Sequence, residues 1–263
     1  HDGMDDILGW CGSGATRRIL VLEQAADGEF VETKTIFTDY VVKDVAAGDL
    51  NDDGVPDIAF VSSVEPLWTG IALSTVDGYG DFAGYEAPRF YSGAVKPDHV
   101  AIGRFSDDAH NSVIVGAKGS SILTAYPMDE NGIPSMGENS SLDPDNQAID
   151  DVSAMAAVNF THIGGSANAL VVADSRLVPV MAIARLRPDN SRRVESVGEM
   201  AIGNGAKDIA VGDIDDDGSP DAAVLCPGSH MVAVFMGEGF ADESYPVSDG
   251  EMVLSGPATD LTL

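Results

Sequence analysis

The apolar residues of this chain fall in short runs that are bounded by acidic or glycine-rich turns. Residues 44–63 show the pattern, because two apolar runs flank the polar segment Asp49–Asp57. Short runs rich in β-branched residues between such turns predict β-strands, and no segment has the apolar period of an amphipathic helix. The pattern therefore predicts an all-β fold, with strands in this part of the chain over 44–49, 58–63, 70–76 and 87–93.

The same pattern recurs along the chain with a regular period. Its phase is marked by Asp49, Arg104, Asn159 and Asp213, which are 55, 55 and 54 residues apart. An alanine lies three residues before each marker, within a run of small or apolar residues. Repeats of this length with several short strands each indicate a propeller or a solenoid, and four antiparallel strands per repeat are typical of a propeller blade.

The two ends of the chain match complementary parts of one repeat. Residues 1–8 correspond to the end of the acidic loop and its following strand, whereas 259–263 correspond to the strand before that loop. Together they would complete a fifth blade and close the ring, which removes exposed sheet edges. The sequence predicts a single propeller domain over 1–263; the alternative is five consecutive blades of a seven- or eight-bladed ring. The predicted blades cover 1–40 with 259–263, 41–95, 96–150, 151–204 and 205–258.

Two of the repeats carry acidic loops with oxygen-bearing side chains at alternate positions. A tightly curled loop turns such side chains inward, with a glycine at the bend and a backbone carbonyl as a further ligand. These are ligands for a hard cation, and calcium fits them best. The candidate ligands are Asp49, Asn51, Asp53, the Val55 carbonyl and Asp57 in the first loop. In the second loop they are Asp213, Asp215, Asp217, the Ser219 carbonyl and Asp221.

An EF-hand shares the start of this motif but requires a glutamate at position 12 and a following helix. Position 12 is Phe60 in one loop and Val224 in the other, and apolar β-type sequence follows both. Each loop is therefore predicted to join two strands. A third, partial copy with Asp2, Met4 and Asp6 lacks the first two ligands and is expected to be a remnant at most.

These loops resemble those of the FG-GAP and VCBS repeat family, which forms the blades of integrin alpha-subunit heads and of many secreted bacterial propellers. The resemblance is specific at 49–57 and 213–221 and extends over the chain as a period. It implies calcium in the hairpin loops, an extracellular or cell-surface setting, and a binding role. The loop at 104–112 departs from the family pattern, with Arg104 and Ser112 in place of the first and last aspartates and Ala109 in place of the glycine. The 159–168 loop carries no carboxylate, and we expect no metal there.

The charge of the chain restricts its partners. Its 43 acidic and 14 basic residues give a net charge of −29, which argues against nucleic acid or an anionic membrane surface as a partner. No apolar run approaches the length that spans a bilayer. The two cysteines, Cys11 and Cys226, follow Asp6 and Asp221 at equal distances; two free thiols are favoured over a disulfide across a ring closure.

The sequence favours an extracellular calcium-binding propeller that acts as a binding, adhesion or assembly module for a protein or carbohydrate ligand. The loops at one rim would present the ligand-binding surface. No catalytic residues are predicted. One alternative is a carbohydrate-active enzyme, either hydrolase or lyase, on the same scaffold. A second alternative is a filament subunit whose strand 259–263 completes the first blade of a neighbouring chain.

Overall fold

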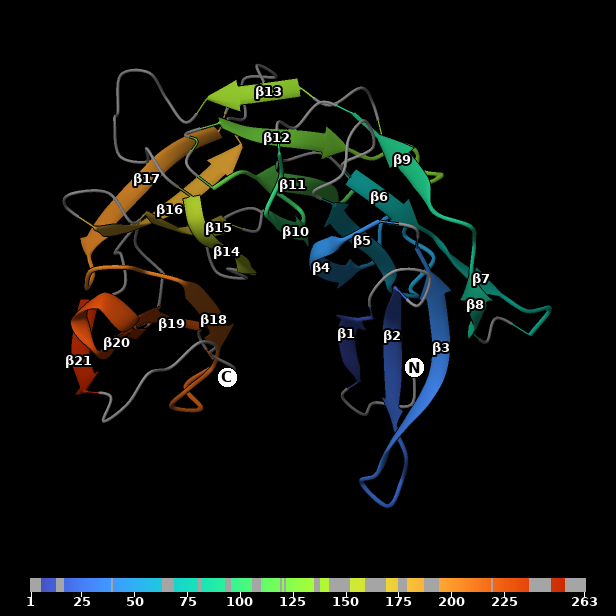
Figure 1. The fold of residues 1–263 in the computed structure, drawn as a ribbon, viewed down its shortest axis with the longest axis horizontal. Helices are drawn as coiled ribbons and strands as arrows, with labels where there is room; N and C mark the ends of the chain where they lie inside the picture. Colours follow the sequence, from blue (N-terminus) through green and yellow to red (C-terminus); the bar gives the residue numbers. More distant parts are fainter. Residues whose placement is uncertain are drawn as a thin grey trace. The chain divides into compact units, whose positions relative to one another are not determined.

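A computed structural model gives the fold of the protein (Figure 1). It describes residues 6–12, 17–38, 40–62, 69–79, 82–92, 96–105, 110–118, 120, 122–134, 138–141, 152–158, 169–174, 179–186, 194–218, 220–236 and 247–253. Within these ranges the regular structure is β-strand apart from one short 3₁₀ turn, Pro227–Ser229. No helix among them is long and apolar enough to cross a membrane. The predicted all-β character is confirmed.

The strands form antiparallel sheets from consecutive segments of the chain. The first sheet has three strands in the order β1-β2-β3, and four sheets have four strands each, in the orders β4-β5-β6-β9, β10-β11-β12-β13, β14-β15-β16-β17 and β18-β19-β20-β21. The strands up to β10 are β1 (Ile7–Cys11), β2 (Arg18–Gln24), β3 (Phe30–Phe37), β4 (Val42–Gly48), β5 (Asp57–Ser62), β6 (Thr69–Ala72), β7 (Ser74–Val76), β8 (Phe82–Tyr85), β9 (Arg89–Tyr91) and β10 (His99–Gly103). The rest are β11 (Ser112–Gly116), β12 (Ile122–Pro127), β13 (Glu138–Ser141), β14 (Val152–Val158), β15 (Ala169–Asp174), β16 (Val180–Leu186), β17 (Val194–Ala201), β18 (Asp208–Gly212), β19 (Asp221–Cys226), β20 (Met231–Met236) and β21 (Val247–Val253).

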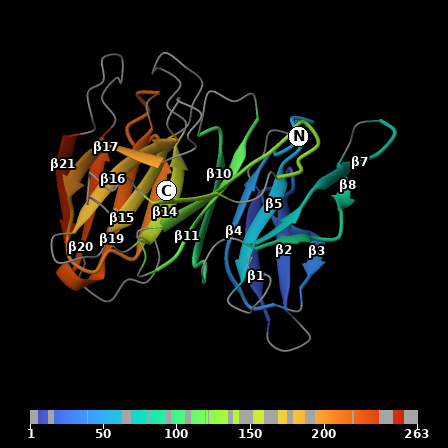
Figure 2. The same ribbon diagram turned by 90° about the horizontal axis from the view of Figure 1, so that it is seen from above.

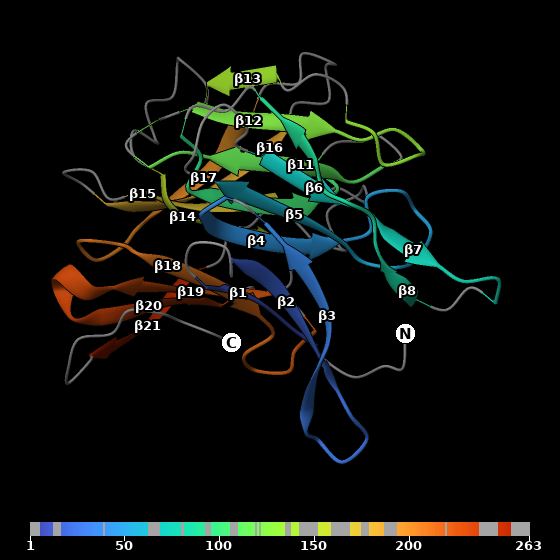
Figure 3. The same ribbon diagram turned by 45° about the vertical axis from the view of Figure 1, so that its right-hand side comes forward.

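The chain divides into two compact units, of which the first comprises 1–102, 110–115 and 126–137. Strand β5 is at its centre, and all six of its residues are buried. Ile58 and Phe60 pack with β2 and β3 on one face, whereas Ala59 and Val61 pack on the other with residues of β10, β11 and β12. Figure 3 shows β5 and β6 between these neighbours. Because both faces are covered, β5 is a nearly continuous apolar run in the sequence.

The second unit comprises 103–109, 116–125 and 138–263. Here the sheet β14–β17 packs against the sheet β18–β21, and Figure 2 shows these two sheets face to face. Their shared core includes Ala154, Met181, Val224 and Phe235. Strand β19 is the counterpart of β5, and its six residues are likewise all buried. Stacked sheets thus form the core within each unit.

The structure adds one element that the sequence pattern did not predict. The small hairpin β7–β8 lies between the third and fourth strands of its repeat, where only a turn at 77–82 was expected. At its tip Tyr79 is almost fully exposed. Strands β4, β5, β6 and β9 overlap the four predicted strands.

The two cysteines carry free thiols. Cys11 is exposed at the end of β1, and Cys226 is buried at the end of β19, where burial raises the pKa of its thiol. The closing segment Asp260–Leu263 and the first five residues lie outside the described ranges.

Close packing at Gly70 leads to a first prediction. A Cβ added to this residue of β6 would lie 2.2 Å from Cζ of the fully buried Phe60 ring. Gly70→Ala is therefore expected to destabilise the protein by about 1–3 kcal/mol, the usual cost of overpacking a core. Urea unfolding measures the change, and Gly78→Ala is the matched control because no heavy atom lies within 4 Å of the place that its methyl group would occupy. Equal stability of the two variants would contradict the packing described.

Candidate metal centres

Both acidic loops are hairpin loops, as the sequence predicted. The first joins β4 to β5, and Gly48 pairs with Asp57 at its base. The second joins β18 to β19, where Gly212 pairs with Asp221. The same register on both hairpins places the candidate ligands of the two loops at equivalent positions.

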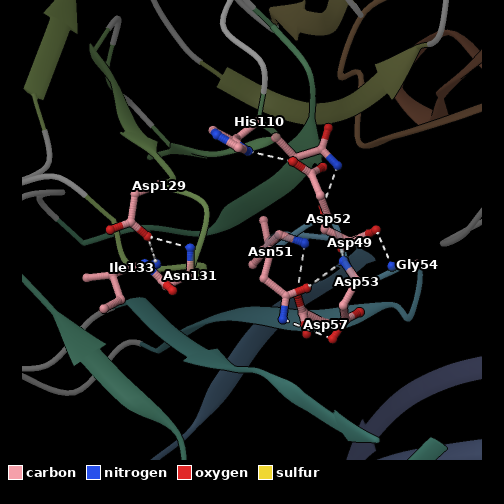
Figure 4. Close-up of polar contacts among 12 residues, drawn as sticks. Asp49, Asn51, Asp52, Asp53, Gly54, Asp57, His110, Asp129, Asn131 and Ile133 are labelled. Atoms are coloured by element: carbon pink, nitrogen blue, oxygen red, sulfur yellow. Dashed lines mark hydrogen bonds and ion pairs between the residues drawn. The ribbon is translucent and has the colours of Figure 1, made fainter. Parts of the chain in front are cut away.

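In the first loop the candidate ligands accept hydrogen bonds from the loop's own backbone (Figure 4). The two carboxylate oxygens of Asp49 accept from the amides of Asp53 at 3.2 Å and Gly54 at 2.8 Å. The side-chain oxygen of Asn51 also accepts from the Asp53 amide, at 3.1 Å, and Asn51 Nδ2 donates to Asp53 Oδ2 at 3.0 Å. Asp53 Oδ1 accepts from the Val55 amide at 2.8 Å. These bonds curl the loop and turn its side-chain oxygens toward its interior.

The second loop repeats three of these bonds at the corresponding positions. Asp213 accepts from the amides of Asp217 at 3.1 Å and Gly218 at 2.8 Å, and Asp215 Oδ1 accepts from the Asp217 amide at 3.2 Å. The bend also has the same backbone conformation in both loops. Asp52 and Asp216 have φ of 58° and 60°, and the glycines that follow two residues later have φ of 83° and 86°. A left-handed aspartate costs of order 1 kcal/mol. Its presence in both loops indicates that both need the same sharp bend.

The last aspartate of each loop fixes the base of its hairpin. Asp57 is fully buried, and its carboxylate accepts from the amides of Leu50 at 2.8 Å and Ser74 at 2.6 Å. Asp221 is 2% exposed and accepts from the amide of Ile214 at 2.6 Å. A buried carboxylate is retained where it satisfies backbone donors that would otherwise lack a partner. These two aspartates therefore hold the loop in place as well as presenting oxygens to it.

The second loop brings its carboxylates close enough for one ion. Carboxylate oxygens of Asp213, Asp215 and Asp221 all lie within 4.8 Å of one another. Oxygens that surround a calcium ion at about 2.3–2.6 Å are separated by at most about 5 Å across the ion, so this donor set fits calcium. In the first loop Asn51 replaces one of the carboxylates, which leaves three acidic candidates and one amide oxygen. A bound Ca²⁺ would offset the mutual repulsion of the carboxylates in each loop.

The other predicted ligands have different outcomes. The carbonyl of Val55 accepts a long bond, 3.5 Å, from the hydroxyl of Ser74. Ser219 lies outside the described residues, as do Asp2 and Met4 of the partial N-terminal copy. Asp6 accepts from the amide of Gln24 at the end of β2, much as Asp57 accepts from Ser74. The last aspartate of the pattern thus keeps its structural bond in this repeat as well.

The burial of Asp57 predicts a pH dependence of the metal-free protein. Burial raises the pKa of this carboxyl above its usual range, although the Ser74 and Leu50 amides oppose the shift. A pKa that is higher in the folded state means that protonated Asp57 favours folding. The contribution of protonated Asp57 to the free energy of unfolding is fully present below the ordinary pKa of about 3.9. It is lost as the pH rises through the pKa of the folded state.

The measurement compares wild type with Asp57→Asn by urea unfolding in calcium-stripped buffer between pH 4 and 7. As the pH rises, the free energy of unfolding of the wild type is expected to fall relative to that of Asp57→Asn. The reason is that only the wild type must ionise a buried group. A difference independent of pH would contradict the account.

Two residues from the following repeat also contact the first loop, and sequence reasoning missed both. His110 Nδ1 lies 2.5 Å from Asp52 Oδ2, and Asn111 Nδ2 donates to the carbonyl of Asp49 at 2.5 Å. Figure 4 shows His110 directed at Asp52. The sequence signal was only that loop 104–112 departs from the ligand pattern. Contacts between residues 58 and 62 positions apart leave no local trace in a sequence.

Comparisons with known proteins show the fold and no more. No family model matches the chain, and no curated protein sequence matches it. Its structure is similar to that of a protein from Lactobacillus plantarum, with a TM-score of 0.58 and 13% identity over 92% of this chain and 67% of that one. It is also similar to a functionally unknown protein from Desulfotomaculum acetoxidans, with a TM-score of 0.61 and 12% identity over 94% of this chain and 68% of that one.

Proposed function

We propose that the protein is a calcium-stabilised β-propeller of the FG-GAP and VCBS type that works outside the cell as a binding or assembly module. The observation that carries the proposal is the set of three hydrogen bonds that loops 49–57 and 213–221 share at equivalent positions. The oxygens of Asp213, Asp215 and Asp221, which gather within 4.8 Å, support it. Two hairpins that share one conformation and one set of candidate ligands have the properties expected of repeated metal sites.

The propeller part of the proposal is supported by the order of the strands. Four sheets of four antiparallel strands, each taken from one stretch of the chain and stacked within each unit, are what propeller blades provide. The first sheet has three strands, and in the closed five-bladed form the 259–263 segment adds the fourth, next to β1. The alternative is a larger ring of seven or eight blades, of which this chain supplies five.

The proposed location sets the calcium affinity that these loops should have. Extracellular calcium modules bind in the range of about 10⁻⁴ to 10⁻³ M. Sites of this strength are filled where calcium is millimolar and are largely empty at cytosolic concentrations. The acidic surface would also keep the molecule soluble and away from anionic partners.

A binding screen tests the proposed role. The protein in 2 mM CaCl₂ is applied to arrays of polysaccharides and of extracellular matrix proteins, and a parallel sample contains EGTA. The proposal predicts retention on a glycan or protein class in calcium and loss of retention in EGTA. Release of reducing ends or unsaturated sugars from a polysaccharide would instead support the enzyme alternative. A molecular mass that rises with protein concentration would support the filament alternative.

A further inference from the structure

The first acidic loop is enclosed by two segments of the following repeat. His110 and Asn111 precede β11, and the turn 129–133 follows β12. Asn111 is anchored to that sheet because its own carbonyl accepts from the amide of Met128 at 3.3 Å. From this anchored position its side chain reaches the Asp49 carbonyl. The hydrogen bond from Asn111 to the Asp49 carbonyl therefore ties the first acidic loop to the sheet that contains β11 and β12.

The turn 129–133 is closed by its own hydrogen bonds and approaches a predicted ligand. Asp129 Oδ1 accepts from the amides of Asn131 and Ile133, both at 2.9 Å, and these bonds lower the pKa of the Asp129 carboxyl. Gly132 adopts a φ of 64°, and a Cβ there would lie 3.2 Å from Cβ of Asn51 and 2.9 Å from a methyl of Leu73. A glycine at this position therefore allows the turn to approach Asn51 closely.

The second loop differs in its surroundings at an equivalent position. Leu50, which follows the first ligand of the first loop, is fully buried, in a cluster that includes Tyr126 and Met128. Its counterpart Ile214 in the second loop is 43% exposed. The first loop is thus embedded in a neighbouring sheet to an extent that the described part of the second loop is not.

The residues that enclose the first loop come from the repeat whose own loop lost its ligand pattern. His110 and Asn111 occupy the positions that Val55 and Pro56 have in the first loop. A segment without a metal to bind is free to use these positions for other contacts. His110 Nδ1 lies within hydrogen-bond distance of Asp52 Oδ2, and this contact ties the bend of the first loop to the neighbouring sheet.

We propose that Asn111 and His110 are positioning residues for the first calcium site, which they preorganise from the neighbouring sheet. This inference rests on the proposed calcium function. Asn111 holds the peptide of the first ligand, Asp49, while His110 links the bend at Asp52 to the neighbouring sheet. A loop held in its binding conformation loses less freedom when the ion binds. The first site therefore binds calcium more tightly than its three carboxylates alone would give.

The test measures calcium binding at the first site by isothermal titration of the full chain. Asp213→Asn with Asp215→Asn disables the second site, and Asn111→Ala and His110→Ala are added singly to this background. Each is expected to weaken calcium binding by about three- to tenfold, the effect of losing one net hydrogen bond. His110→Asn keeps a donor near the position of Nδ1 and is expected to restore most of the affinity.

The reciprocal background separates positioning from general damage to the fold. With Asp49→Asn and Asp53→Asn disabling the first site, Asn111→Ala is expected to leave calcium affinity at the second site within about twofold, because a lost positioning contact acts locally. Equal loss at both sites would assign Asn111 a general structural role and overturn the inference.

The remaining outcomes are also decisive. Unchanged affinity at the first site in both Asn111→Ala and His110→Ala would overturn the inference while leaving the calcium function intact. Absence of calcium binding in the background that retains the first site would overturn the proposed function at that loop and the inference with it. If Asn111→Ala does not fold, the pair His110→Ala and His110→Asn decides the matter, because His110 is only partly buried.

Discussion

Calcium at 10 mM is expected to raise the free energy of unfolding by about 3–5 kcal/mol. Each of two sites with a dissociation constant of about 10⁻⁴ to 10⁻³ M contributes about 1.4–2.7 kcal/mol at this concentration. The reason is that the ion binds the folded loop and relieves the repulsion among its carboxylates. For a chain of this size the midpoint of thermal unfolding should rise by roughly 5–15 °C.

Differential scanning calorimetry in 10 mM CaCl₂ and in EGTA measures this rise. Magnesium at the same concentration is the control for ionic strength and charge screening, and it should give a much smaller rise, because the smaller ion demands stricter geometry and dehydrates reluctantly. An equal rise with both ions would mean that general screening of the acidic surface, rather than the two loops, accounts for the effect.

Replacement of Asp57 by alanine is expected to destabilise the protein by about 2–5 kcal/mol even without calcium. Two amides, those of Leu50 and Ser74, lose their acceptor on this side chain in a buried environment, and each unsatisfied group costs about 1–3 kcal/mol. Urea unfolding in EGTA measures the loss.

Asp53→Ala is the matched control for this variant. Asp53 belongs to the same loop and the same ligand set, but it is exposed and its bonds lie within the loop. Asp53→Ala should lose the stabilisation that calcium bound at one site provides. Its free energy of unfolding without calcium should change by less than about 1 kcal/mol. Equal destabilisation by the two variants in EGTA would show that burial of Asp57 does not distinguish it from the exposed ligands.

The acidic loops could be placed from the sequence because their signal is local. Alternate ligand positions, a glycine at the bend and flanking apolar runs lie within about twenty residues, and the structure shows both loops as hairpins between antiparallel strands. The all-β character was predictable for the same reason, since β5 and β19 are continuous apolar runs covered on both faces.

The features that the sequence did not predict depend on contacts between distant segments. Leu50 and Ile214 look alike in the sequence, yet one is fully buried and the other is 43% exposed. Asp57 receives the Ser74 amide, and Asp52 receives His110, through tertiary packing alone. The β7–β8 hairpin was missed because Ser74–Val76 follows β6 with no glycine or proline between them to mark a break.

Calcium stoichiometry is the most direct test of the central claim that the two loops are metal sites. Equilibrium dialysis of the full chain is expected to give two bound calcium ions per chain at saturation. Asp49→Asn and Asp213→Asn should each leave one, and the double variant none. Failure of the wild type to bind calcium, or two ions still bound by the double variant, would contradict the account.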